Sequence, residues 1–395
     1  METKDKIKAL SQQYLNKIIE IRRHIHSNPE LSFNEYNTAD YITTVLKELN
    51  LPVARMAKTG LVVNLQGKNA GKVIALRADI DALPIEEKND IPYKSTKAGI
   101  MHACGHDAHT ASLLGTAMIL NELKNEWSGT IKLIFQPGEE RIPGGASIMI
   151  KEGVLENPSP ASIIGQHVFP PLEAGKVGFC SGTYMASCDE IYLTVKGKGG
   201  HAAVPASYVN PILITSAILL ELNEKFMKHP KNDIPTVLAF GKVQANGATN
   251  VIPQEVLVDG TFRTMNEEWR NEAHEIIRNT IIAKAKEMGG DCEVRIDKGY
   301  PVLVNNDTVT GNARAAAETY LGKENVVTLE KRMTSEDFAF YSLVKPACFY
   351  RLGTGNVARG ITSGVHTPTF DIDEKALETG MGLMAWLAIN ELNKA

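Results

Sequence analysis

The chain has 395 residues, and at about 150 residues per domain this length indicates two or three domains. Hydrophobic residues make up 43% of the chain and charged residues 22%, a balance typical of soluble globular proteins. The formal net charge of −4 provides no cationic field for nucleic acid or for an anionic membrane. No apolar run approaches the roughly 18 residues of a membrane span. We therefore expect neither nucleic acid nor a membrane as a partner.

The N-terminal sequence and the cysteine usage indicate the cellular compartment in which the protein is expected. The first ten residues, METKDKIKAL, are charged and lack an apolar core, so the sequence predicts no secretory signal. The cysteines are few, odd in number and scattered, which argues against a disulfide framework: Cys104, Cys180, Cys188, Cys292 and Cys348. This usage is typical of a reducing compartment, and the prediction is a cytoplasmic protein.

The first 180 residues alternate between helical and strand-like patterns. Apolar residues at helical spacing predict a helix over 3–26, which Asn28-Pro29 ends. The remaining expected elements follow in chain order: a helix over 35–49, strands at 60–66 and 72–78, a helix over 107–123, a strand at 130–136, a short helix near 146–152 and a strand at 162–167. Strands that alternate with helices indicate an α/β layer architecture with a largely parallel sheet.

The pattern changes between about 183 and 298. A strand at 190–196, a helix at 211–226, strands at 236–243 and 256–263, a helix at 266–288 and a strand at 291–297 follow the β-α-β-β-α-β order of a ferredoxin-like unit. The α/β pattern resumes with helices at 308–321 and 335–343, a strand at 347–352 and a helix at 374–393. We therefore expect one α/β domain built from 1–182 and 300–395, with a domain of residues 183–299 inserted into it.

The densest group of chemically capable residues is the segment MHACGHDAH, residues 101–109. Cys104 and His106 are two positions apart, so an extended chain would point both side chains the same way. They precede a predicted helix, whose N-terminal dipole favours a thiolate. Thiolate and imidazole suit a transition metal. The alternative is a buried cysteine beside histidines that begin a helix.

Further candidate ligands follow strands. Glu139 and Glu140 come directly after the strand at 130–136, and as adjacent carboxylates we expect them to diverge, so that one binds a cation while the other holds the attacking water. His167 ends a strand, and His366 lies in a loop before the last helix. Sites in α/β sheets form beyond the carboxyl ends of strands. More than four ligands favours two metals. The alternatives are a solvated acidic loop and polar strand caps.

Other motifs supply supporting residues. Asp79 and Asp81 close the strand at 72–78 and could orient a ligand histidine, or could simply cap the turn before Pro84. In the inserted domain, His201 could donate a hydrogen bond to a developing oxyanion. Asn250 and Arg263 could bind a carboxylate, although an arginine at a strand end is usually a surface residue.

These motifs together resemble the M20 metallopeptidases, in particular the amidohydrolase branch that includes hippurate hydrolases, auxin-conjugate hydrolases and N-acyl-amino-acid deacylases. The resemblance runs nearly end to end, and the segments that carry it are Arg22-Arg23 with His26, 29–31, 77–84, 102–109, 135–140, 144–146, 165–167, 197–203, 249–253, 260–264, 335–338 and 366–371. Departures from the pattern are Gly138, where alanine is more usual, Asn210 and Ala206. None of them falls on a ligand position.

The resemblance implies a discontinuous zinc-peptidase-like α/β catalytic domain with an inserted ferredoxin-like lid and dimerisation domain. It implies two divalent metal ions with five ligands, Cys104, His106, Glu140, His167 and His366, and it places Glu139 on the general-base position. His201 falls on a lid position that stabilises the transition state, often across a dimer. Asn250 and Arg263 fall near positions for the substrate carboxylate, and a homodimer or higher homo-oligomer is expected.

The function that this resemblance implies is a metal-dependent amidohydrolase, which cleaves small N-acyl-L-amino acids to a carboxylic acid and a free amino acid. The alternative is a dipeptidase or carboxypeptidase of the same superfamily, which acts on short peptides. A non-catalytic binding module would be expected to lose part of the ligand set, and a structural zinc site would need only four ligands and no base. Zinc suits the ligands, while manganese, cobalt and nickel also fit.

Overall fold

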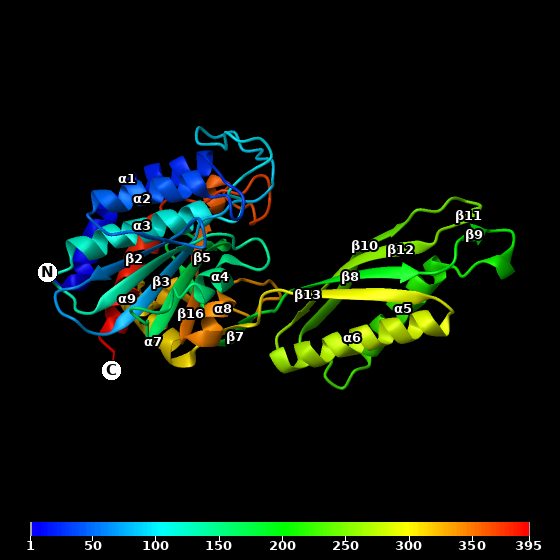
Figure 1. The fold of residues 1–395 in the computed structure, drawn as a ribbon. Helices are drawn as coiled ribbons and strands as arrows, with labels where there is room; N and C mark the ends of the chain where they lie inside the picture. The colour runs from blue at the N-terminus through cyan, green and yellow to red at the C-terminus, as the bar shows by residue number, and fades with distance from the viewer. Residues whose placement is uncertain (1, 395) are drawn as a thin grey trace. The chain divides into compact units, whose positions relative to one another are not determined.

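The computed structural model describes residues 2–394, which form two compact units (Figure 1). The first unit contains the residues up to Thr183, Val304–Glu330 and the residues from Asp337 onward. The second unit contains Tyr184–Leu303 together with the short segment Lys331–Glu336. The sequence analysis did not anticipate that residues 331–336 belong with the second unit.

The first unit is built on an eight-stranded sheet with the order β1-β2-β4-β3-β5-β16-β6-β15. Its strands are β1 (Ala54–Met56), β2 (Gly60–Gln66), β3 (Val73–Asp79), β4 (Thr130–Gln136), β5 (Ser162–Glu173), β6 (Val177–Phe179), β15 (Val326–Thr328) and β16 (Ala347–Gly355). The four central strands, β4, β3, β5 and β16, are parallel, whereas β1–β2, β2–β4 and β16–β6 pair antiparallel. The pair β6–β15 at one edge is also parallel, so the sheet is mixed rather than parallel throughout.

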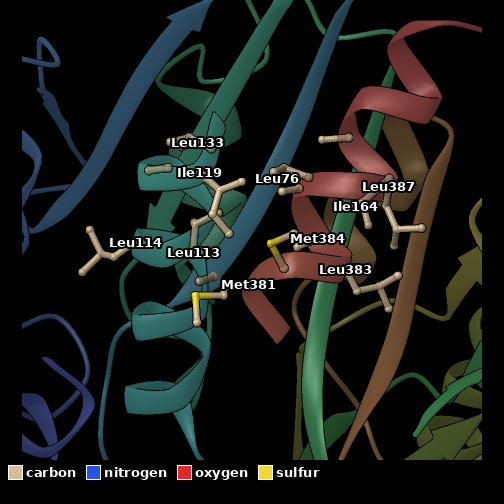
Figure 2. Close-up of a cluster of buried hydrophobic side chains, with 14 of the residues drawn as sticks. Leu76, Leu113, Leu114, Ile119, Leu133, Ile164, Met381, Leu383, Met384 and Leu387 are labelled. Carbon is tan, nitrogen blue, oxygen red and sulfur yellow. The ribbon is translucent and has the colours of Figure 1, made fainter. Parts of the chain in front are cut away.

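Helices cover this sheet. They are α1 (Thr3–Ser27), α2 (Tyr36–Glu48), α3 (His106–Glu122), α4 (Gly145–Lys151), α7 (Asp307–Leu321), α8 (Ala339–Val344) and α9 (Ala376–Leu392). The two helices α3 and α9 are apolar on nearly all sides because they pack on each other, on the sheet and beneath α1. Figure 2 shows Leu113 and Ile119 of α3 near Met384 of α9 and Leu76 of β3. Gly115 permits this close approach, since a Cβ there would lie 2.6 Å from Sδ of Met381.

Several expected elements differ from the structure. The helix expected at 335–343 begins later than expected, because the chain is helical only over α8, Ala339–Val344. The strands β1, β6 and β15 are three residues each, too short to produce an alternating pattern in the sequence. The strand expected to end at His167 continues to Glu173, which lets β16 pair along its full length.

The second unit has its own sheet, β8 (Asp189–Lys196), β10 (Thr236–Ala245), β12 (Glu255–Thr264) and β13 (Asp291–Lys298), antiparallel in the order β10-β12-β8-β13. Two helices, α5 (Pro211–Met227) and α6 (Glu267–Glu287), pack on it around a separate apolar core. Asn210 and Asn266 cap them by accepting a backbone N–H. The small elements of the described residues are β9 (Gly200–His201) paired with β11 (Val251–Ile252), and β7 (Gly182–Met185) paired with β14 (Leu303–Asn305). One 3₁₀ turn, Pro205–Ser207, lies in the second unit, and two others, Lys323–Asn325 and Val357–Arg359, lie in the first.

Residues 2–394 contain no helix that combines the length and the apolar character needed to cross a bilayer.

Candidate metal centre

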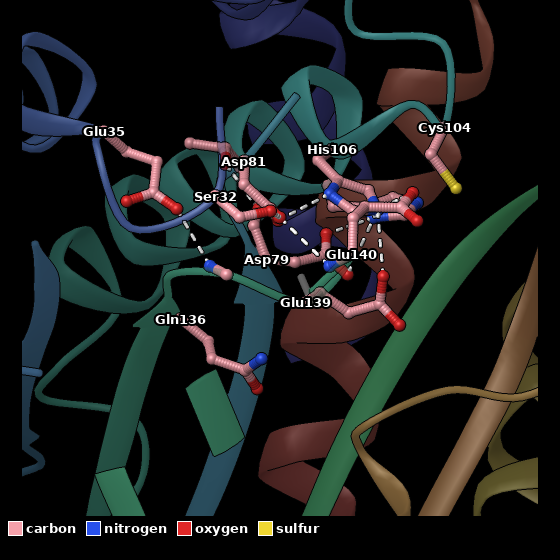
Figure 3. Close-up of polar contacts among 12 residues, drawn as sticks. Ser32, Glu35, Asp79, Asp81, Cys104, His106, Gln136, Glu139 and Glu140 are labelled. Carbon is pink, nitrogen blue, oxygen red and sulfur yellow. Dashed lines mark hydrogen bonds and ion pairs between the residues drawn. The ribbon is translucent and has the colours of Figure 1, made fainter. Parts of the chain in front are cut away.

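The candidate ligands converge at one edge of the central sheet. Strand β3 ends at Asp79, and β4 ends at Gln136, so that Glu139 and Glu140 follow its carboxyl end. His167 lies in the parallel strand β5, and Cys104 precedes the start of α3. The carboxyl ends of parallel strands meet at the same edge, which explains how segments distant in sequence come together here (Figure 3).

The five predicted ligands form two overlapping groups. Cys104, His106 and His167 make the first, and Cys104, Glu140 and His366 make the second; within each group the ligand atoms all lie within 4.8 Å of one another. Sγ of Cys104 is 3.4 Å from Nε2 of His167, and Nε2 of His366 is 3.1 Å from Oε1 of Glu140. Cys104 belongs to both groups, so its sulfur could serve as a ligand in either of them.

His366 reaches this cluster through an unusual backbone conformation. Its φ is +62°, in the left-handed region that non-glycine residues rarely adopt. Its N–H donates to the carbonyl of Ala103 at 2.7 Å, which fixes the loop beside Cys104. Strain of this kind persists at sites where surrounding contacts hold the backbone in place.

Two buried atoms of the cluster test whether a cation fits. Nε2 of His106 and Oε1 of Glu140 make no hydrogen bond among residues 2–394, although Nε2 of His366 lies 3.1 Å from this oxygen as an ion-pair partner. They are 3.8 Å apart, too far for a hydrogen bond to each other. Buried polar atoms in folded proteins are nearly always satisfied. Divalent cations suit these thiol, imidazole and carboxylate donors and would satisfy both atoms.

Asp81 fixes two of the candidate ligands at once. Its Oδ1 is 3.1 Å from Nδ1 of His106, an arrangement that turns Nε2 of the ring toward the cluster. Its Oδ2 accepts hydrogen bonds from the hydroxyl of Ser32 at 2.6 Å and from the N–H of Glu140 at 3.0 Å. Figure 3 shows Asp81 between Ser32 and His106.

Asp79 lies deeper and is held by two partners. Its Oδ1 is 2.5 Å from Nδ1 of His109, and its Oδ2 accepts from Nη1 of Arg77 at 2.7 Å. His109 uses its other ring nitrogen, Nε2, to accept the N–H of Val168 at 2.8 Å. His109 therefore ties α3 to β5 next to His167, a role that the sequence analysis missed.

Arg77, Gln136 and Asp337 form a buried platform beneath these residues. Arg77 donates to Oε1 of Gln136 and to Oδ1 of Asp337, each at 2.8 Å. Asp337 also accepts from Nε2 of Gln136 and from the N–H of Ala146. All three belong to motifs that carry the family resemblance, but nothing local in the sequence marks them as buried and mutually bonded.

The carboxylates dominate the electrostatics of the cluster. Burial alone would lower the pKa of His106, but Asp79 and Asp81 outweigh burial and raise this pKa to about 10. Burial, followed by Glu140 and Glu139, raises the pKa of the Cys104 thiol well above its ordinary value. Both shifts report a surplus of negative charge. The same field favours a bound cation, which would release the protons of His106 and Cys104.

Glu139 faces the same cluster. It is buried, its Oε1 accepts the N–H of Asp337 at 3.4 Å, and its Oε2 is 4.0 Å from Nε2 of His106. Ligand atoms of Glu139, Glu140 and His106 lie within 4.8 Å of one another. The expectation that the two adjacent carboxylates diverge is therefore wrong. Gly138, with φ +58°, begins the turn that brings both to one cluster.

The predicted residues of the second unit lie in two places. His201 is exposed and pairs with Val251, so that it lies beside Asn250, whose carbonyl accepts the N–H of Ala202. Arg263 lies near the other end of β12 and donates to the carbonyl of Met333 at 3.2 Å. At about 3.4 Å per residue, β12 separates Glu255 from Arg263 by roughly 27 Å. The unit therefore does not bring Arg263 together with His201 and Asn250.

Comparisons with known proteins show which chains this one is similar to. The chain is 38% identical over 377 residues to the N-acetylcysteine deacetylase of Bacillus subtilis, covering 94% of this chain and 96% of that one. It is 35% identical over 398 residues to thermostable carboxypeptidase 2 of Saccharolobus solfataricus, covering 100% of both. The crystal structure of a dinuclear metal-binding peptidase of the M20 family from Bacillus subtilis superposes with a TM-score of 0.84 at 35% identity, covering 97% of this chain and 100% of that one.

The family model for peptidase family M20/M25/M40 matches residues 75–390, which include every candidate ligand and the whole second unit. The match confirms the resemblance on which the sequence analysis relied. The chain belongs to this peptidase family.

Proposed function

We propose that this protein is a two-metal amidohydrolase that cleaves N-acyl-L-amino acids to a carboxylic acid and a free amino acid. One observation carries the proposal: two groups of three ligands share the sulfur of Cys104, and the carboxylate of Glu139 lies beside them. A site with five ligands and a separate carboxylate is more than a structural zinc site needs. The similarity to a deacetylase of N-acetylcysteine, itself an N-acyl amino acid, supports the substrate class.

Within this proposal, Cys104, His106 and His167 hold one divalent cation, Cys104, Glu140 and His366 hold the other, and Asp79 and Asp81 keep the ligands in place. Zinc, manganese, cobalt and nickel all suit this set of sulfur, nitrogen and oxygen donors. The bound cations supply Lewis-acid activation of the attacking water and of the amide carbonyl.

Glu139 moves the protons of the reaction. Its carboxylate accepts a proton from water as the water oxygen attacks the amide carbon, and a C–O bond forms. When the C–N bond breaks, Glu139 returns this proton to the departing amine nitrogen, so that a carboxylic acid and a free amine result. Its burial, together with the hydrogen bond from the N–H of Asp337, keeps the carboxylate oriented toward the cluster.

We further propose that the second unit is an inserted ferredoxin-like lid and dimerisation domain. His201 stabilises the oxyanion, and Asn250 and Arg263 bind the substrate carboxylate. His201 and Asn250 lie in segments beyond the Glu255 end of β12, and β12 itself separates Glu255 from Arg263 by roughly 27 Å, so one copy of this unit cannot place all three on one small substrate. Two copies could each contribute one end of the unit, which supports a homodimer or higher homo-oligomer.

The surface of the second unit supports this assembly. Strand β10 is an edge of its sheet, and an unpaired edge is a template for pairing with another chain. The adjoining helix α5 exposes apolar side chains, with Leu213 60% and Leu220 71% exposed, and Val243 on β10 is 54% exposed. Analytical ultracentrifugation of the protein against a variant with L213E and L220E would show whether this face joins two copies. A cytoplasmic location, supported by the scattered cysteines, completes the proposal.

A panel of substrates tests the function. We expect turnover of N-acetyl and N-benzoyl amino acids, together with about two equivalents of metal by elemental analysis. Blocking the substrate carboxylate as an amide should raise KM, because Asn250 and Arg263 would lose their partner. If dipeptides with a free amino group are cleaved faster than every N-acyl amino acid, the peptidase alternative replaces this proposal. The similarity to a thermostable carboxypeptidase is the observation that favours that alternative.

A further inference from the structure

The turn between α1 and α2 contains a fully buried carboxylate that the proposed reaction does not use. Glu35 is 0% exposed. Its Oε1 accepts the N–H of Phe33 at 2.8 Å and the N–H of Gly138 at 2.8 Å, and its Oε2 accepts the hydroxyl of Thr59 at 2.6 Å. Figure 3 shows the Glu35 carboxylate directed toward the chain that leaves β4. A side chain near the N-terminus thus holds the backbone N–H of Gly138, the residue directly before Glu139.

The ring of Phe33 occupies the space beside that amide. Phe33 has a φ of +66° and Gly138 a φ of +58°, both in the left-handed region. A Cβ at position 138 would lie 2.3 Å from Cε1 of Phe33, closer than two carbon atoms can approach. The N–H of Phe33 bonds to the same Glu35 oxygen as the N–H of Gly138. Glu35 therefore holds the strained residue and the glycine against each other.

The same turn also supports the other side of Glu139. Ser32 donates to Oδ2 of Asp81, and this oxygen accepts the N–H of Glu140. Residues 32–35 consequently support the backbone on both sides of Glu139. Glu35 accepts the N–H of Gly138, and Ser32 holds Asp81, which accepts the N–H of Glu140. The carbonyl of Gly138 is held as well, by the N–H of Gly145 at 3.0 Å. The backbone on both sides of Glu139 is fixed by buried hydrogen bonds.

We propose that Glu35 is a positioning residue for Glu139, acting as the acceptor that holds the Gly138 amide and thereby sets where the Glu139 carboxylate lies. The assignment rests on the proposed function of Glu139. Within residues 2–394, the side chain of Glu35 bonds only to the turn, to Gly138 and to Thr59, so its effect on catalysis passes through the backbone. What matters is an oxygen acceptor at this place, which a neutral amide can also provide.

Three variants test this role: E35A, E35Q and T59V. E35A removes the acceptor, and we expect kcat to fall by about 10- to 100-fold, since a misplacement of about 1 Å can cost that much. KM and the metal content should stay within about twofold of the wild-type values, because Glu35 touches neither substrate nor ligands. E35Q keeps an oxygen acceptor and should recover kcat to within about threefold of wild type.

T59V is the matched control for disturbing this buried site. It removes a hydrogen bond to Glu35 but leaves the one between Glu35 and Gly138, so kcat should stay within about twofold of wild type even if the melting temperature falls. The proposal is overturned if E35A retains the kcat of T59V, if E35Q loses as much as E35A, or if E35A loses its metal in proportion to its activity.

A second measurement does not depend on turnover. Hydrogen–deuterium exchange of a peptide that covers residues 137–141 should be faster in E35A than in wild type and T59V, because the Gly138 N–H loses its acceptor. Unchanged exchange would overturn the role of Glu35. Failure of wild type on the whole substrate panel would instead overturn the proposed function, and the exchange experiment would still decide whether Glu35 holds this turn.

Discussion

Two groups of mostly buried ionisable residues meet at the start of α3 and differ in how their charges are balanced. His106 belongs to the ligand cluster, by which we mean the five candidate ligands together with Asp81 and Glu139. The next residue, Asp107, belongs to a group that we call the Arg22 cluster: Arg22, His26, Asp107, Asp371 and Glu374. There, Arg22 is fully buried and donates to Asp107 and Asp371, each at 2.7 Å, and to Glu374 at 3.3 Å. In the ligand cluster, the ion pairs of Asp81 and Glu140 within residues 2–394 involve only histidines.

This difference in the partners of the carboxylates indicates which of the two clusters can bind a metal ion. Arginine stays protonated in proteins, so a carboxylate paired with Arg22 keeps its cation permanently and has no need of another. Histidine and cysteine can give up their protons, and their lone pairs then become ligands. The acidic group lined by histidine and cysteine is therefore the one that we propose as the metal site, and the group closed by arginine is part of the framework.

The largest effect, on turnover, should follow from substituting Glu139, which we propose carries the protons of the reaction. Glu139→Gln keeps the size of the side chain but removes its basicity, and we expect kcat to fall by about 10³-fold or more, within the range of general acid–base catalysis. The metal content should be unchanged, since Glu139 is not among the five ligands. Steady-state kinetics with elemental analysis measures both, and a near-normal rate would remove Glu139 from this role.

The next largest effect should come from the Arg22 cluster. Arg22→Met removes the guanidinium from the fully buried carboxylate of Asp107 and from the partly buried one of Asp371, and breaking the buried pair with Asp107 costs about 3–5 kcal/mol of stability. Urea unfolding of the metal-free protein measures this cost. Arg23, whose side chain is 43% exposed, is the matched control, and Arg23→Met should cost less than about 1 kcal/mol. Equal losses in both variants would contradict the distinction between the two clusters.

Glu35 is a third case for this comparison: a buried carboxylate that forms no ion pair with an arginine within residues 2–394. Burial, with Asp81 as the next contribution, raises the pKa of Glu35 from 4.5 to about 7. The folded state therefore favours the protonated acid, and the stability it contributes is complete below pH 4.5 and is lost as the pH rises through 7. In metal-free protein, E35Q should become more stable than wild type across this window, by at most about 3 kcal/mol. A constant difference between pH 5 and pH 8 would contradict the assignment.

The smallest effect on stability should come from removing the metal. A chelator should lower the melting temperature, since a cation at 100 times its Kd stabilises the folded state by about 2.7 kcal/mol. Calorimetry before and after chelation, then after adding zinc or manganese, measures the loss and its recovery. His366→Ala sharpens the test because His366 belongs only to the second group of ligands. This variant should retain about one equivalent of metal, and retention of two would exclude His366 as a ligand.

The sequence analysis predicted the residues of the ligand cluster better than their arrangement. The motifs around Cys104, Glu139 and His167 are local, and each follows a strand or precedes a helix whose pattern is readable. The family assignment that these motifs supported is confirmed by the match over residues 75–390. The divergence of Glu139 and Glu140 was wrong, because the left-handed turn at Gly138 is set by contacts with Phe33 and Glu35, more than 100 positions away in sequence.

The shortest strands and the residues that support the ligands could not be predicted from the sequence, because they too depend on contacts with distant segments. Strands of three residues, such as β6 and β15, form because neighbouring strands offer hydrogen bonds, which no local pattern records. His109 and Glu35 look like ordinary polar residues in the sequence, and only their burial against Val168 and Gly138 reveals what they hold. The roles of His201, Asn250 and Arg263 remain predictions.

The sequence by itself determined the family, the alternation of strands and helices, and the set of residues capable of binding metal, because these depend on local pattern and residue chemistry. Only the tertiary structure decided which of those residues share one buried cluster, that Cys104 belongs to both groups of ligands, and that an N-terminal turn holds the backbone around Glu139. These features depend on where distant segments pack, and packing also determines which buried carboxylates meet an arginine and which meet a histidine.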